Sequence, residues 1–196
     1  MSQDGENCRL PAVAESELSE AQRQVRAAIA QGPRGRLSGP FGVLLRSPEL
    51  CQRTQLLGEY LRFDSVIPQR LRELAILATA YHWRQSYEWQ THAPIARGLG
   101  IGEECIAALA GGRQPPAPAA DEAVVLSFCR QLHAAHAVDD ATYAAARGLL
   151  GEAGVVELCG ICGYYALLAM VLNVARTPPP DGTATAFESS PEAASG

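Results

Sequence analysis

The chain has 196 residues, a length typical of a single domain that buries a sizeable core. Its formal net charge is -5, and no basic tract is interleaved with aromatic residues, which argues against nucleic acid as a partner. All 16 basic residues are arginine, so mechanisms that need a lysine, such as Schiff-base catalysis or a Walker-type phosphate loop, are excluded.

The N-terminal sequence MSQDGENCRLP lacks the apolar core of a signal peptide. The cysteines are scattered along the chain rather than spaced like a disulfide framework. They lie at positions 8, 51, 105, 129, 159 and 162. We therefore expect a cytoplasmic protein whose thiols are mostly free.

Apolar residues recur at helical spacing through most of the chain, and no segment alternates with the two-residue period of a half-buried strand. The first helix is expected over residues 15–30, followed by a loop over residues 31–42. Ser47 suits an N-cap and Pro48 the first position of the next helix. Pro68 is expected to open another helix in the same way.

The following helix is expected to begin near residues 84–86 and to carry the sequence YEWQTH, residues 87–92. Pro94 should kink or end it, because proline cannot donate the backbone hydrogen bond and clashes with the preceding turn. Three more helices are predicted, over residues 101–112, 121–136 and 139–154.

The segment 155–175 is apolar on nearly all its faces. Its length would suit a membrane span, but Glu157, Asn173 and two glycines interrupt it. We interpret it as a helix buried in a core or a subunit interface, which predicts a homo-oligomer and no membrane association.

The two ends differ in composition from the middle of the chain. Residues 177–196 are rich in proline, serine, alanine and glycine, which predicts a disordered tail, and residues 1–8 are expected to be mobile as well. A single helical domain is therefore predicted over residues 9–176.

Glu88 and His92 lie one helical turn apart, so their side chains can meet on one face of the helix. A carboxylate beside an imidazole favours the charged ring and fixes its tautomer, which would let His92 act as a general acid or base. Glu73, one helix earlier, would reach the same cleft if the two helices pack antiparallel. The spacing alone is weak evidence, because such pairs are common on exposed helices and contribute only about 0.2–0.5 kcal/mol.

Cys159 and Cys162 form a C-x-x-C sequence, which can be a redox pair. They lie in the most apolar stretch of the chain, where burial raises the pKa of a thiol, and small residues there also suit close helix packing. Two histidines, His133 and His136, could form one edge of a metal site with a nearby aspartate, although a solvated helix end is favoured.

Three sequence elements together resemble the carboxymuconolactone decarboxylase family, within the AhpD-like superfamily. They are RELAIL (residues 72–77), YEWQTH (residues 87–92) and the run to GLG (residues 98–100), with similar flanking pieces at residues 44–48 and 163–173. The resemblance covers most of residues 38–176. It implies an all-α, AhpD-like helical fold that assembles as a homo-oligomer, a trimer or hexamer in the family's habit, with a dimer as the other possibility.

The sequence departs from the alkylhydroperoxidase members of this superfamily. Those proteins carry a glutamate, then C-x-x-C, then a histidine four residues later, and Glu73 and His92 match the first and last of these. The two cysteine positions hold Gln85 and Glu88, so the family's peroxidase chemistry cannot run at this site. Decarboxylase-like members instead carry an acidic residue four before the histidine, as Glu88 does here.

The resemblance therefore implies an acid–base enzyme that needs no cofactor or metal. It would decarboxylate, isomerise or dehydrate a small lactone or enolisable carbonyl acid. His92 would donate and relay the proton. Glu88 would orient the His92 ring or act as a second acid–base group, and Glu73 would support the relay through water.

Five further residues are expected to bind substrate: Tyr87, Trp89, Arg72, Gln85 and His82. Arg72 would hold a substrate carboxylate through a bidentate pair, unless it forms a surface ion pair. Two other functions stay open. One is a thiol-dependent alkylhydroperoxidase or disulfide reductase that uses Cys159 and Cys162, and the other is a non-catalytic oligomeric binding protein.

Overall fold

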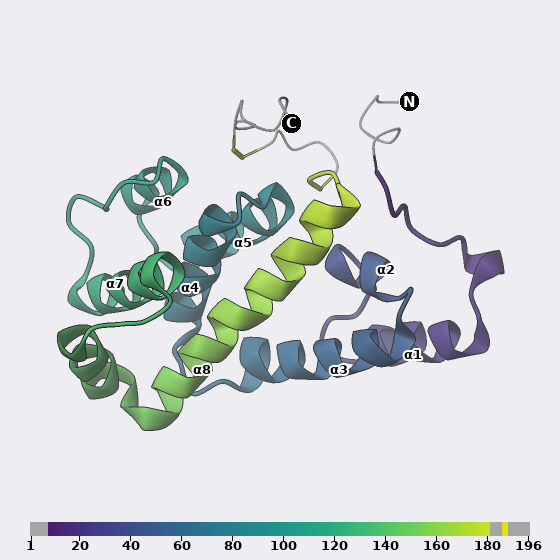
Figure 1. The fold of residues 1–196 in the computed structure, drawn as a ribbon, viewed down its shortest axis with the longest axis horizontal. Helices are drawn as coiled ribbons and strands as arrows, with labels where there is room; N and C mark the ends of the chain where they lie inside the picture. The colour runs from purple at the N-terminus through teal and green to yellow at the C-terminus, as the bar shows by residue number, and fades with distance from the viewer. Residues whose placement is uncertain (1–7, 181–185, 188–196) are drawn as a thin grey trace.

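The computed structural model describes residues 8–180 and 186–187, and its regular elements are all helical (Figure 1). The helices are α1 (Glu20–Gln31), α2 (Pro40–Leu44), α3 (Pro48–Glu59), α4 (Gln69–His82), α5 (Ser86–Gly98), α6 (Glu103–Ala110), α7 (Ala120–Ala135) and α8 (Asp140–Ala175). A short 3-10 turn, η2 (Glu15–Glu17), precedes α1, and a π-helical turn, η3 (Tyr60–Asp64), extends α3. The predicted all-α class is confirmed.

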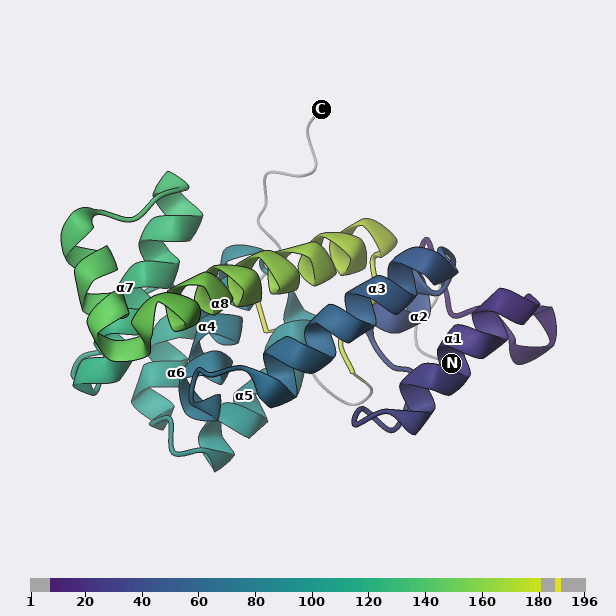
Figure 2. The ribbon, with the colours of Figure 1, turned by 90° about the horizontal axis from the view of Figure 1, so that it is seen from below.

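Figure 2 shows α8 along the length of the molecule, from the end near α7 to the end near α2 and α3, and in Figure 1 the same helix runs diagonally between two groups of helices. On one side lie α4 to α7, and on the other lie α1 to α3. Helix α4 is the centre of the packing, because α5, α7 and α8 all pack against it. The larger hydrophobic core joins α4, α7 and α8 to the N-terminal helices, and a smaller core lies among α4, α5 and α6.

The local signals for helix starts act mostly as predicted. Helix α3 begins at Pro48 with Ser47 as its N-cap, although the Ser47 side chain makes no capping hydrogen bond. Helix α4 begins at Gln69, one residue later than expected, because Pro68 is the N-cap rather than the first helical residue.

Two predictions about helix ends are corrected. The expected loop 31–42 contains the start of α2, which Gly39 permits by adopting a φ of 57° just before Pro40. Helix α5 does not end at Pro94 but continues to Gly98. Pro94 lies on the exposed side of α5, where water can hydrate the carbonyl of the preceding turn.

The last two expected helices form one element, α8, whose two parts meet at Gly151 rather than after residue 154. Gly151 has a φ of 71° and a ψ of 177°, a conformation that favours glycine. By length and composition alone α8 could cross a membrane, but half of its most apolar stretch is buried inside the protein, as is common for a core helix.

The expected tail 177–196 is only partly described, and Phe187 within it is buried. Its ring packs edge-to-face on Trp89 and Tyr81, with ring centroids 5.3 and 6.0 Å apart. An aromatic side chain gains more from this apolar contact than from solvent, and the disorder of the tail stays a prediction. The tail predictions for residues 1–7, 181–185 and 188–196 lie outside the described residues.

Candidate active site

The packing of α5 on α4 brings a histidine and a glutamate from the two helices into contact. His92 Nδ1 lies 2.6 Å from Glu73 Oε2, and both side chains are only 3% exposed. A hydrogen bond this short between two buried groups fixes the orientation of the imidazole ring.

Glu88, one turn before His92 on α5, approaches the other ring nitrogen. His92 Nε2 lies 3.5 Å from Glu88 Oε2. The second carboxylate oxygen, Glu88 Oε1, is buried and has no hydrogen-bond partner in the described part of the chain. A buried carboxylate oxygen without a donor is costly, so this oxygen is suited to accept a hydrogen bond from a bound molecule.

The two carboxylates determine the charge of His92. Burial alone would lower its pKa, but the hydrogen bonds to Glu73 and Glu88, together with their charges, raise the pKa to about 9. The ring is therefore a cation at neutral pH. A buried imidazolium held between two acids is arranged as a proton donor.

Two tyrosines of α8 lie beside this group. The Tyr165 ring packs edge-on against His92, with ring centroids 5.2 Å apart, and Tyr164 packs in the same way against Tyr165. Burial raises the pKa of Tyr164 to about 12 and that of Tyr165 well above its ordinary value, so both phenols keep their protons at neutral pH.

His92 and Glu88 open onto a cavity of about 400 Å³. Glu73 does not line it, so the Nδ1 side of the ring is turned away and Nε2 is the nitrogen on the cavity side. The lining residues are Arg34, Arg36, Ser38, Pro40, Phe41, Arg62, Tyr87, Glu88, Gln90, Thr91, His92, Tyr165, Leu168 and Pro180. The lining includes three arginines and one carboxylate, so the wall of this cavity carries a net positive charge.

Arg34 is the best-positioned of these arginines. Its guanidinium lies 4.5 Å from the centroid of the Phe41 ring, and Nη2 donates a hydrogen bond of 3.3 Å to the Tyr164 hydroxyl. Its Nε is buried and has no acceptor among the described residues. A fixed guanidinium with an unused donor is suited to bind a carboxylate.

Of the five substrate-binding residues predicted from sequence, Tyr87 lines the cavity and Trp89 and Gln85 do not. Trp89 is 5% exposed and belongs to the smaller core, beside Phe187. Gln85 is the N-cap of α5: its Oε1 accepts from the Tyr87 backbone N–H and its Nε2 donates to Asn173. Both residues support the helix that carries the site.

Arg72 and His82 also lie outside this cavity. Arg72 is 8% exposed, and its Nε and Nη1 have no hydrogen-bond partner within the described chain. Burial raises the pKa of Glu157, but its hydrogen bonds and the charge of Arg72 lower it below its ordinary value. His82 lines a second cavity, where its ring stacks on that of His133. Neither lines the cavity onto which His92 opens.

The sequence reasoning missed the three arginines and the two tyrosines. Arg34 and Arg36 come from the loop before α2, Arg62 from η3, and the tyrosines from α8, so only the tertiary structure brings them together. The one sequence signal was the pair of arginines in the glycine- and proline-rich stretch GPRGR.

The alternative of a redox pair at Cys159 and Cys162 stays open. Cys159 is exposed and Cys162 is buried, and the Cys162 sulfur lies 3.7 Å from that of Cys129. Within the described residues, no group of three or more histidine, cysteine or acidic side chains is arranged to hold a metal ion.

Residues 48–138 match the model of the carboxymuconolactone decarboxylase family. The match covers a little under half of the chain. It runs from the start of α3 to the end of the α7–α8 connection and includes Glu73, Glu88, His92 and Arg62. Arg34 and Tyr165, which complete the cavity, lie outside the matched residues.

Two solved structures are similar to this chain over most of its length. One is an alkylhydroperoxidase AhpD core protein from Ralstonia eutropha JMP134, described as an uncharacterized peroxidase-related protein. It has a TM-score of 0.71 and 20% identity, and the match covers 89% of this chain and 93% of that one. The other is an uncharacterized peroxidase-related protein from Silicibacter sp. TM1040.

That second match has a TM-score of 0.71 and 14% identity, and it covers 92% of this chain and 96% of the other. At these identities the likeness establishes the AhpD-like helical fold. No curated protein matches the sequence.

Proposed function

We propose that this protein is an acid–base enzyme that acts on a small lactone or enolisable acid bearing a carboxylate, with decarboxylation as the first reaction to test. The observation that carries the proposal is the buried His92, which is held between Glu73 and Glu88 at the wall of an arginine-lined cavity.

The geometry suits the protonation of carbon. Loss of CO2 from such a lactone leaves an enolate-like intermediate, which needs a proton donor near the carbon and a positive group near the developing oxyanion. His92 Nε2 faces the cavity and carries a proton at neutral pH, because its pKa is raised to about 9. Glu73 holds the opposite nitrogen, so the ring cannot turn away from the substrate.

The arginines supply recognition. Arg34, Arg36 and Arg62 line the cavity from two segments, and each can bind a carboxylate. A substrate with two carboxylates could keep one bound to an arginine while the other leaves as CO2. Carboxymuconolactone, the substrate in the family's name, is an acid of this kind.

Two observations support this proposal over its rivals. The positions of the family's peroxidatic cysteines hold Gln85, which caps α5, and Glu88, which contacts His92. The histidine and both glutamates are nearly inaccessible to bulk water, which is a costly arrangement for a protein that only needs a surface for binding.

The test is an assay of 4-carboxymuconolactone that follows loss of the lactone and release of CO2. We expect turnover by the wild type, a loss of about 100-fold or more in His92→Gln, and full activity in Cys159→Ser, whose exposed thiol does not line the cavity. Arg34→Gln should raise KM more than it lowers kcat.

Two results would contradict the proposal. Equal turnover by the wild type and His92→Gln would remove His92 from the chemistry. If calorimetry shows that the lactone binds without turnover, the cavity is a binding site, as the non-catalytic alternative predicts.

A further inference from the structure

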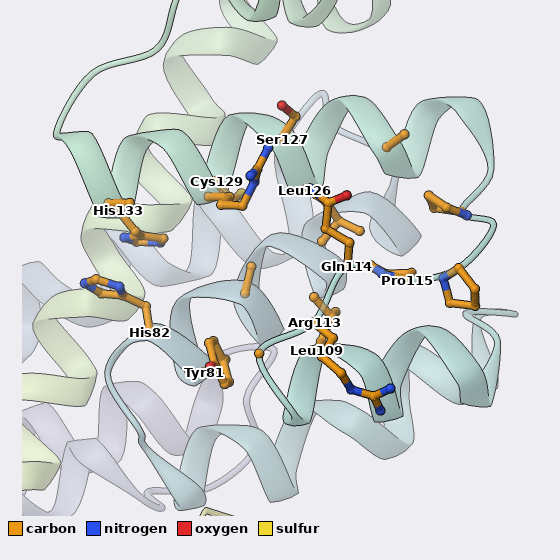
Figure 3. A pocket seen from close by; sticks show the side chains of 17 residues that line it. Tyr81, His82, Leu109, Arg113, Gln114, Pro115, Leu126, Ser127, Cys129 and His133 are labelled. Carbon is orange, nitrogen blue, oxygen red and sulfur yellow. The ribbon is translucent and has the colours of Figure 1, made fainter. Parts of the chain in front are cut away.

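A second cavity, of about 620 Å³, lies between α4, α7 and the α6–α7 loop (Figure 3). It is larger than the His92 cavity, whose volume is about 400 Å³, and the two cavities share no lining residue. A cavity of this size can enclose most of a small organic molecule. The side chains that line it therefore indicate which class of molecule it suits.

The apolar part of the wall comes from three elements. Ala78 lies on α4, Leu109 near the end of α6 and Leu126 on α7. Pro115 and two further prolines of the α6–α7 loop extend this apolar wall. In Figure 3, Pro115 lies on the side of the cavity opposite to the two histidines that line it. The apolar wall suits the hydrocarbon part of a ligand.

Two imidazole rings form the other end of the cavity. His82 on α4 and His133 on α7 face each other, with ring centroids 4.7 Å apart and ring planes at 15°. The Thr79 hydroxyl donates to the Ala75 carbonyl at 2.9 Å, so it accepts from His133 Nε2, also at 2.9 Å. Burial lowers the pKa of His82, and the charges of His133 and His136 lower it further. This end of the cavity therefore disfavours a further cation and favours an anion.

The lining also carries two arginines and no acidic residue. Arg113 lies in the α6–α7 loop and Arg130 lies on α7. Neither side chain forms an ion pair or a hydrogen bond within the described part of the chain. The acids at the start of α7, Asp121 and Glu122, do not line the cavity and pair with Arg70 instead. The positive charge of the cavity is therefore left without a partner.

We propose that this second cavity binds a small organic acid with an apolar body. The carboxylate lies at the end formed by Arg130, His82 and His133, where charged and neutral donors meet. The apolar body lies between Leu109 and Leu126. On α7 these groups follow one face, because Leu126, Arg130 and His133 are four and three residues apart.

Both parts of the ligand are needed to match the cavity. A neutral molecule would leave the arginines without a counter-charge, and a small inorganic anion would leave the apolar wall in contact with water. The site is independent of the proposed acid–base function, since none of the residues assigned to that function lines it.

The test titrates the full-length, reduced protein with 4-phenylbutyrate at neutral pH. Calorimetry measures the affinity, and NMR of isotope-labelled histidine locates the ligand, because the chain has only four histidines. The expected result is binding that moves the signals of His82 and His133. An absence of binding, or signals that move only at His92, would overturn the proposal.

Two related compounds test the two parts of the ligand. 4-Phenylbutanamide keeps the shape without the charge, and acetate keeps the charge without the apolar body. Each should bind about tenfold or more weakly than 4-phenylbutyrate, because each lacks one of the two interactions. An amide that binds as tightly as the acid would show that the cavity does not recognise an anion. Acetate that binds as tightly would show that the apolar wall plays no part.

Variants of α7 test the position of the carboxylate. Ser127 lines the cavity one turn before Arg130, and neither residue is buried, so substitutions there should not prevent folding. Ser127→Asp should weaken the binding of 4-phenylbutyrate about tenfold by charge repulsion, whereas Ser127→Asn, of equal size, should bind it nearly as the wild type does.

Arg130→Gln should weaken binding by a similar factor of about ten. Arg147→Gln is its control, because it removes an exposed arginine that lines neither cavity, and it should leave the affinity unchanged. Equal affinities in Ser127→Asp and Ser127→Asn, or in Arg130→Gln and Arg147→Gln, would refute the assignment of the carboxylate to this end of the cavity.

Discussion

His92 shows how two neighbouring acids set the behaviour of one residue. Helical spacing places Glu88 near its Nε2, and packing of α4 on α5 places Glu73 at its Nδ1. Sequence spacing found the first contact, but only the tertiary structure establishes the second, which is shorter.

The raised pKa of His92 should appear as a pH-dependent stability. The group binds its proton more tightly in the folded chain, at about 9 against an ordinary value of 6.5. Its stabilisation is therefore fully present below pH 6.5 and is lost as the pH rises through 9. Urea unfolding of the wild type should weaken over this window by up to about 3 kcal/mol, and that of His92→Gln should not. Parallel profiles for the two proteins would contradict the assignment.

The two glutamates should contribute unequally to that pKa. Glu73 lies 2.6 Å from the ring and Glu88 lies 3.5 Å away, so Glu73→Gln should lower the pKa of His92 more than Glu88→Gln does. NMR titration of isotope-labelled histidine can follow all four rings of the chain at once. A larger effect of Glu88→Gln would show that the distances do not order the two interactions.

The positions of the predicted substrate-binding residues that do not line the His92 cavity also have a local cause. Successive residues on a helix point about 100° apart, so Trp89 cannot share the face of Glu88 and His92 and turns into the smaller core instead. Arg72 precedes Glu73 and diverges from it for the same reason. The arginines of the cavity could not be predicted, because no local pattern indicates which loop approaches α5.

At the scale of helices, the site depends on a close contact between α3 and α8. A side-chain carbon added at Gly58 would lie 1.9 Å from the Tyr164 hydroxyl and 2.5 Å from Arg34 Nη2. Glycine at this position lets Tyr164 reach and hold Arg34 at the cavity.

Gly58→Ala should therefore affect both stability and substrate binding. We expect a loss of about 1–3 kcal/mol in the free energy of unfolding, because the buried Tyr164 must shift, and weaker binding of a carboxylate as Arg34 moves with it. Calorimetry and urea unfolding would measure these effects. Gly163→Ala on α8 is the matched control, since an added carbon there meets nothing within 4 Å. Equal effects in both variants would contradict the account of the α3–α8 contact.

Helix positions were predictable from sequence where capping residues and prolines mark the boundaries, as at Ser47 and Pro48. The predicted helix boundaries were wrong at Pro94 and Gly151, where the position of the residue in the folded protein decides its effect on the helix. Pro94 does not end α5 because it lies on the exposed side, and Gly151 bends α8 at a point that apolar periodicity does not mark.

For the whole molecule, the class of fold followed from helical periodicity, and the arrangement of the helices followed from the family resemblance. An exposed apolar surface formed by Tyr60, Val66 and Val156 lies around Glu157, which accepts hydrogen bonds from the Tyr60 hydroxyl and the Val66 N–H. We propose that a second copy of the chain covers this surface in a homo-oligomer.

Light scattering coupled to size-exclusion chromatography should then give a mass that is a multiple of 20.8 kDa. Val156→Glu should lower that mass, because it places a charge on a residue that is 71% exposed at the centre of the proposed contact. Val174→Glu, at the other end of α8 and 62% exposed, is the control and should leave it unchanged. A monomeric wild type would contradict the proposal.

The most direct measurement of the central claim is the turnover of 4-carboxymuconolactone in D2O by the wild type and by His92→Gln. If the protonated His92 delivers a proton to carbon, the wild-type product should carry one carbon-bound deuterium, and His92→Gln should form it at least about 100-fold more slowly. A product without carbon-bound deuterium, or equal rates for the two proteins, would contradict the claim that His92 is the acid of this site.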